Sequence, residues 1–142
     1  MNPEMDTFGI AEIAELSGLT IPQIEQGISR ERIEVRGKGR PRQFLPRDAF
    51  TFCVIGEMRR LGIDWGRIEG STAGPWPIDD PFEIDRTLFL LLTPASNGSL
   101  DLTYVTHGQI AKHLKSFKAS GGILIDASAI ARRIETFARK QR

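Results

Sequence analysis

The sequence has few of the features that mark secreted or membrane-spanning proteins. It contains one cysteine, Cys53, so no disulfide can form within the chain, and the apolar residues around Cys53 indicate a buried structural thiol. The longest apolar run, residues 88–92, is far too short to span a bilayer. No basic segment followed by an apolar one resembles a secretory leader. We therefore expect a cytoplasmic protein.

Groupings of residues that would carry out catalysis or bind metal are also missing from the sequence. His107 and His113 are six residues apart, with no cysteine nearby and no obvious carboxylate partner. The segment GKGRPRQ has glycines, but it lacks the strand-to-helix setting and the Lys-Ser/Thr ending of a phosphate-binding loop. Four carboxylates that could chelate a cation fall on a proline-rich stretch typical of a solvated linker: Asp79, Asp80, Glu83 and Asp85. We predict no catalytic residues, no metal ligands and no cofactor, hence not an enzyme.

Charge is balanced overall but segregated along the chain. The formal net charge is +1, whereas residues 1–35, 36–60, 61–86 and 87–142 carry net charges of −5, +5, −4 and +5. Such segregation predicts a basic face, the electrostatic footprint of a nucleic-acid-binding protein, despite the near-neutral total. The alternative is that folding intermixes the four blocks.

Two short helices separated by a tight turn are predicted near the N-terminus. In residues 9–17 apolar side chains recur at helical spacing, and Glu12 and Glu15 fall on the opposite face. Gly18 stands where the chain must turn sharply and suits a positive φ, and Leu19 is apolar enough to pack between the two helices. The apolar positions of the first helix are Ile10, Ile13, Ala14 and Leu16.

The second helix is predicted to begin at about residue 21. Thr20 suits the N-cap, Gln23 completes a capping box three residues later, and Pro22 is tolerated in the first turn. Gly27 predicts that the helix is short. Its inward residues are Ile24 and Ile28.

Residues 36–44, here called the basic loop, carry cations at every second position. An extended hairpin would align these cations along one edge, with glycines supplying the tight turn, and such an edge suits DNA phosphates. Phe44 and Leu45 would close the loop onto the core, and Pro46 with Asp48 begins a third, strongly apolar helix ending at Arg59 and Arg60. The alternating cations are Arg36, Lys38, Arg40 and Arg42.

Three features follow one another over about residues 7–70: the pattern FGIAEIAELSGLTIPQIEQGI, a glycine-arginine loop ending in an aromatic residue, and a helix finishing IGEMRRLGIDWGRIEG. Together they resemble the DNA-binding domain of MerR-type regulators and their excisionase-like relatives. The resemblance implies a winged helix-turn-helix that binds double-stranded DNA. Ile13, Ala14, Gly18 and Leu19 resemble the family's packing positions, Arg40 and Phe44 its wing arginine and aromatic residue, and residues 61–63 the signature that ends its third helix.

In a helix-turn-helix the exposed N-terminal part of the second helix faces the major groove. The candidates for base contact are therefore Ile21, Gln23, Glu25 and Gln26. The family usually has basic and aromatic residues in this helix, and this chain departs from that pattern. The predicted DNA-binding residues are Thr20, Gln23, Gln26, Arg36, Lys38, Arg40 and Arg42. The alternative interpretation of residues 8–62 is a small helical bundle with an ordinary basic surface loop.

The second half of the chain predicts a different architecture. Residues 70–86 are rich in proline, glycine and acid, which indicates a linker, and their prolines forbid the long coiled-coil helix found in well-known members of the family. Beyond the linker we predict strands at 87–93 and 100–106, a helix at 107–120, a strand at 123–125, and a closing helix capped by Asp126 or Ser128. The fold class is therefore α+β: a winged helix-turn-helix domain (residues 1–69), a linker (70–86) and a β-β-α-β-α module (87–142).

The function predicted from these features is a DNA-binding transcriptional regulator. A single winged helix reads few base pairs, so we expect a homodimer joined through residues 87–142, with residues 88–92 and the closing helix as its apolar surface. One alternative is an architectural or packaging protein of a mobile element or phage, of the excisionase or terminase small-subunit type. Another is a protein-interaction module that has lost DNA binding and contacts a protein partner instead.

Overall fold

The computed structural model describes residues 7–29, 37–64, 88–94, 98, 100–116 and 121–140. Within this part of the chain five α-helices and one three-stranded antiparallel sheet give an α+β fold, as predicted. The elements are α1 (Ile10–Ser17), α2 (Ile21–Ser29), α3 (Pro46–Arg60), β1 (Leu88–Pro94), β2 (Leu100–Thr106), a 3-10 turn (His107–Gln109), α4 (Ile110–Ser116), β3 (Ile123–Asp126) and α5 (Ala127–Lys140).

The first two helices form where the local signals predicted them. Gly18 has φ of 76°, in the left-handed region, and its N–H donates to the carbonyl of Ala14 to end α1. The side chain of Leu19 is buried beside this turn. The helix α2 begins at Ile21 as expected but continues through Gly27 to Ser29, because one glycine weakens a helix without ending it.

The third helix begins at Pro46, as predicted, and crosses α1 at close range. The main-chain N–H of Leu45 donates to Asp48 Oδ2 at 2.8 Å, so Asp48 supplies the polar cap. A Cβ on Gly56 would lie 2.0 Å from the carbonyl oxygen of Ser17. Only glycine therefore permits the observed α1–α3 crossing.

The sheet has the strand order β2-β1-β3, with both pairings antiparallel. Leu91 opposes Thr103 on one side and Leu124 on the other. As the central strand, β1 buries residues on both faces, as its continuous apolar run predicted. Asp126 Oδ1 accepts a hydrogen bond from Ala129 N at the start of α5, so Asp126, rather than Ser128, is the cap.

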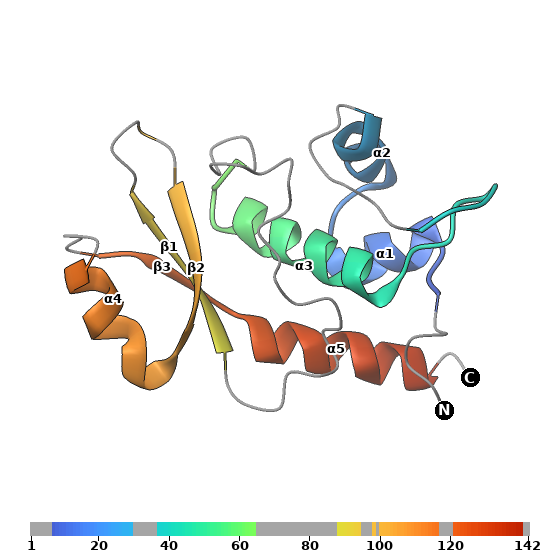
Figure 1. Ribbon diagram of the computed structural model, residues 1–142. Coiled ribbons are helices and arrows are strands. Elements are labelled where there is room, and N and C mark those ends of the chain that lie inside the picture. The colour runs from blue at the N-terminus through green and yellow to red at the C-terminus, as the bar shows by residue number, and fades with distance from the viewer. Residues whose placement is uncertain are drawn as a thin grey trace.

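The helix α5 joins the two halves of the chain. It extends from the sheet and runs beneath α3 (Figure 1). The rings of Phe8 and Phe137 lie 6.4 Å apart, and one buried cluster contains residues from α1, α2, α3, α5 and the sheet. Ile130 and Ile134 of α5 are among its members. The described halves thus share one hydrophobic core.

Two features of the second half of the chain differ from the sequence-based expectations. The predicted helix at 107–120 is split, with a 3-10 turn preceding α4, and residues 117–120 lie outside the described part. The predicted linker, residues 70–86, also lies outside it. The apolar surface expected to join two copies is used within one chain, because Leu90, Leu91 and Leu92 are buried in the central strand and α5 packs its apolar face on α3.

Candidate nucleic-acid interface

The helix α2 is held to the molecule by few side chains. Of its nine residues only Ile24 is fully buried, and Ile28 is half-buried. Ile21, Glu25 and Gln26 are exposed, and α2 stands at the edge of the molecule, away from the sheet (Figure 1). Most of its surface is therefore accessible to a partner.

The predicted capping box of α2 is confirmed, and it changes the role expected of Gln23. Gln23 N donates to Thr20 Oγ1 at 3.2 Å, and Thr20 N donates to Gln23 Oε1 at 2.9 Å. The carboxamide oxygen of Gln23 is thus engaged by the main chain, and only its amide nitrogen can donate elsewhere. Reading adenine needs both groups of a glutamine, so Gln26, which is exposed, is the better candidate.

Asp48 anchors the basic loop, a role that the sequence analysis missed. The buried carboxylate oxygen Oδ2 accepts hydrogen bonds from Gly37 N at 2.9 Å and from Leu45 N at 2.8 Å, and so ties both ends of the loop to the start of α3. A Cβ on Gly37 would lie 1.8 Å from the carbonyl oxygen of Gln43, so the two arms of the loop are in close contact there. The sequence signal was Asp48 three residues after Leu45, but it indicated only the helix start.

Among its described residues the basic loop makes a tight turn, and no strand ladder joins its two arms there. Gln43 N donates to the Lys38 carbonyl, Gly39 has φ of 108°, and the Arg40–Pro41 peptide bond is cis. In the described part of the loop the only β-bridge joins Phe44 to Phe8, which precedes α1. Pro41 cannot donate to a ladder, which weakens pairing across the loop itself.

The cations of the basic loop differ in their freedom to meet a ligand. Lys38, Arg40 and Arg42 are all exposed, but Arg42 Nη1 donates to the Gly37 carbonyl at 2.9 Å. Arg42 therefore also braces the loop, whereas Lys38 and Arg40 lie at its tip. Arg36 lies outside the described residues, so its predicted place beside them stays a prediction.

A hollow of about 360 Å³ lies between α2 and the basic loop. Its walls include Glu25 and Ile28 of α2 and Pro41, Arg42 and Phe44 of the loop. The loop thus runs beside the C-terminal half of α2, and both elements belong to one surface.

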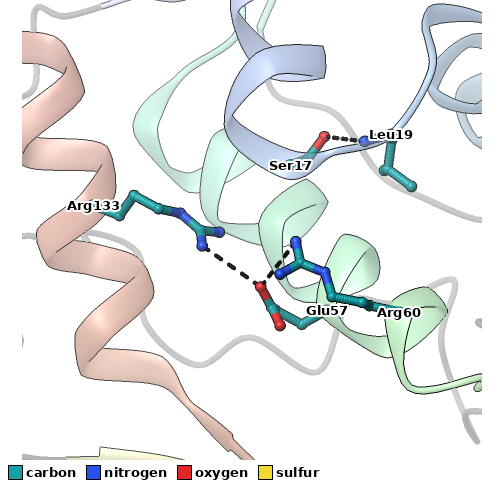
Figure 2. A network of polar contacts seen from close by, with 5 residues as sticks. All are labelled: Ser17, Leu19, Glu57, Arg60 and Arg133. Carbon is teal, nitrogen blue, oxygen red and sulfur yellow. Dashed lines mark hydrogen bonds and ion pairs between the residues drawn. The ribbon is translucent and has the colours of Figure 1, made fainter.

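Near the C-terminal end of α3, polar contacts join this helix to α5 (Figure 2). Glu57 Oε1 lies 3.4 Å from Arg60 Nη2 and 3.6 Å from Arg133 Nη1, so one carboxylate draws two guanidinium groups together. Beside them, Leu19 N donates to Ser17 Oγ at 3.1 Å in the α1–α2 turn. No local signal in the sequence pairs Glu57 with Arg133, because the two residues are 76 positions apart.

The buried Cys53 and the half-buried Tyr104 both have a raised pKa and stay protonated at neutral pH. Burial raises the pKa of the Cys53 thiol, and the nearby guanidinium of Arg133 opposes this only in part. Burial also raises the pKa of Tyr104, whose phenol oxygen has no hydrogen-bond partner among the described residues. Cys53 is therefore a structural thiol, as predicted.

In the described segments no three histidine, cysteine or acidic residues gather as a metal site. No helix in the same segments has the length and apolar character needed to cross a membrane.

Comparison of the sequence with protein-family models gives no match, and comparison with curated proteins gives none either.

Proposed function

We propose that the protein binds double-stranded DNA, with α2 in the major groove and the basic loop on the phosphate backbone, and that it regulates transcription. The observation that carries the proposal is the shared surface of these two elements. An accessible, capped helix lies directly beside a turn that presents Lys38 and Arg40. This is the pairing of base-reading helix and backbone-gripping loop that a winged helix-turn-helix requires.

The basic loop and α2 contribute to binding in different ways, because their side chains differ in chemistry. Lys38 and Arg40 supply affinity that is insensitive to sequence and falls with salt, because phosphate contacts release counterions. Gln26 supplies selectivity, because an exposed carboxamide can pair with both N6 and N7 of adenine. Arg42 braces the loop from within through its hydrogen bond to the Gly37 carbonyl.

Selection of duplexes from a random pool by the full chain, followed by footprinting in genomic DNA, tests this proposal. A discrete promoter-proximal palindrome is the expected result for a regulator. Arrays of sites at an attachment or packaging locus would instead assign the same DNA-binding surface to the mobile-element alternative. No enrichment of any duplex at low salt would contradict DNA binding altogether.

One observation favours a second candidate, a protein-interaction module. The helix α2 has no lysine or arginine, and its one charged residue is Glu25. An acidic, partly apolar helix surface suits a basic protein partner better than a phosphate backbone does. Failure of the selection, together with capture of one specific protein that is lost in a Glu25→Lys variant, would support this candidate.

The dimer predicted from the sequence remains a proposal. Two copies would present two α2 helices to half-sites about one helical turn apart and would give useful selectivity. Sedimentation equilibrium at tens of micromolar, with and without a selected duplex, distinguishes a constitutive dimer from one that forms on DNA. A 1:1 complex on the selected duplex would contradict the dimer.

A further inference from the structure

The two arginines around Glu57 form a cationic pair that the basic loop does not include. Both guanidiniums lie within 3.6 Å of the same oxygen, Glu57 Oε1, so they are close to each other as well. The pair carries two positive charges against one negative charge. The side chains of Arg60 and Arg133 are 63% and 41% exposed, so both are partly accessible to a ligand.

The cationic pair lies close to the turn between α1 and α2. A Cβ on Gly18 would lie 3.6 Å from Arg60 Nη2, so this guanidinium lies against the turn between α1 and α2 (Figure 2). In helix-turn-helix complexes the first helix crosses the DNA backbone while the second enters the groove. If α2 occupies the groove, the turn at Gly18 and the adjacent guanidiniums face a phosphate strand.

We infer that Arg60 and Arg133 together bind a backbone phosphate of duplex DNA at the α1–α2 turn, on a side of α2 that the basic loop does not cover. This inference rests on the proposed function and extends it, because it makes α5 part of the DNA-binding surface. Paired guanidiniums match the geometry of phosphate oxygens and bind them through charge-assisted hydrogen bonds. Glu57 holds the two groups together before DNA arrives and, as an anion, weakens their attraction for phosphate.

The test is duplex binding by the full chain over a salt series, using Arg133→Gln and Glu57→Gln. Arg133→Gln is expected to weaken binding to all duplexes by about five- to tenfold and to reduce the salt slope by about one unit. Glu57→Gln is expected to strengthen binding severalfold, a gain that partial unfolding cannot produce. Arg133→Lys, which keeps the charge but loses the planar guanidinium, is expected to recover only part of the affinity.

The same helix offers matched controls. Arg139 and Glu135 form an ion pair elsewhere on α5, so Arg139→Gln and Glu135→Gln make the same charge changes outside the proposed site. The inference would be overturned if Arg133→Gln and Arg139→Gln changed duplex affinity equally, and Glu57→Gln and Glu135→Gln did so as well. In that case a loss of affinity in Arg40→Gln would still support the proposed function. Absence of duplex binding by the unaltered protein would overturn both.

Discussion

At the scale of single residues, a glycine decides how closely two helices approach. Gly56 lies in α3 where the main chain of Ser17 passes, and the space between them does not admit a methyl group. The apolar sequence around Gly56 gives no reason for its small size, since the contact joins residues 39 positions apart. Such long-range steric requirements depend on the tertiary fold, not on local pattern.

Gly56→Ala is expected to lower the free energy of unfolding by about 3 kcal/mol, because α1 and α3 must separate to relieve an overlap with backbone. Chemical denaturation followed by circular dichroism measures the change. Gly108→Ala is the control, since an added Cβ there meets nothing within 4 Å, and it should change stability by less than about 0.5 kcal/mol. Equal stability of the two variants would show that the crossing is looser than the structure has it.

Tyr104→Phe is expected to raise the free energy of unfolding by about 1 kcal/mol at neutral pH, because it removes a buried hydroxyl without a partner. The raised pKa of Tyr104 also gives the direction of a pH effect. A phenol that ionises more readily in the unfolded chain destabilises the fold as the pH rises past about 10, its unfolded pKa. Denaturation at several alkaline pH values should show a smaller loss for Tyr104→Phe than for the unaltered protein, and an equal loss would exclude this origin.

At the scale of elements, the sequence predicted the features that depend on local signals but not those that depend on long-range contacts. The positions of α1, α2 and α3 follow from the Gly18 turn, the Thr20–Gln23 box and Pro46, all of which act within a few residues. Alternating residues in the basic loop indicated extended chain but not the partner of Phe44, which pairs with Phe8. The hydrogen bond from Gly37 N to Asp48 joins residues 11 positions apart, so no local signal predicted it.

The two glutamines of α2 are expected to separate into a structural and a functional role. Gln23→Ala should lower the free energy of unfolding by about 0.5–1 kcal/mol, because the main-chain N–H of Thr20 loses its acceptor. Gln26→Ala should leave stability unchanged but weaken binding to a selected duplex by about 1–3 kcal/mol, with little effect on random DNA. Parallel denaturation and fluorescence anisotropy check both variants, and a selective loss of cognate binding in Gln23→Ala alone would reverse the assignment.

At the scale of the whole molecule, α5 makes the C-terminal part a component of the fold that presents α2. Its apolar face covers α3, and Phe137 lies against Phe8. We therefore expect a chain ending at residue 69 to unfold at a lower temperature than the full chain, because apolar surface of α3 becomes exposed. Differential scanning calorimetry measures this, and an unchanged melting temperature would mean that residues 1–69 fold independently, as the sequence-based domain boundaries imply.

We propose that α2 and the basic loop form one DNA-binding surface, and the salt dependence of duplex binding is the sharpest test of this proposal. Fluorescence anisotropy with a selected and a random duplex would compare the full chain with an Arg40→Ala, Arg42→Ala variant over a range of salt concentrations. We expect tight, salt-sensitive binding by the unaltered chain. In the variant we expect a similar loss of affinity on both duplexes and a salt slope lower by about one or two units. Unchanged affinity and slope in the variant, or no binding by the unaltered chain at low salt, would contradict the proposal.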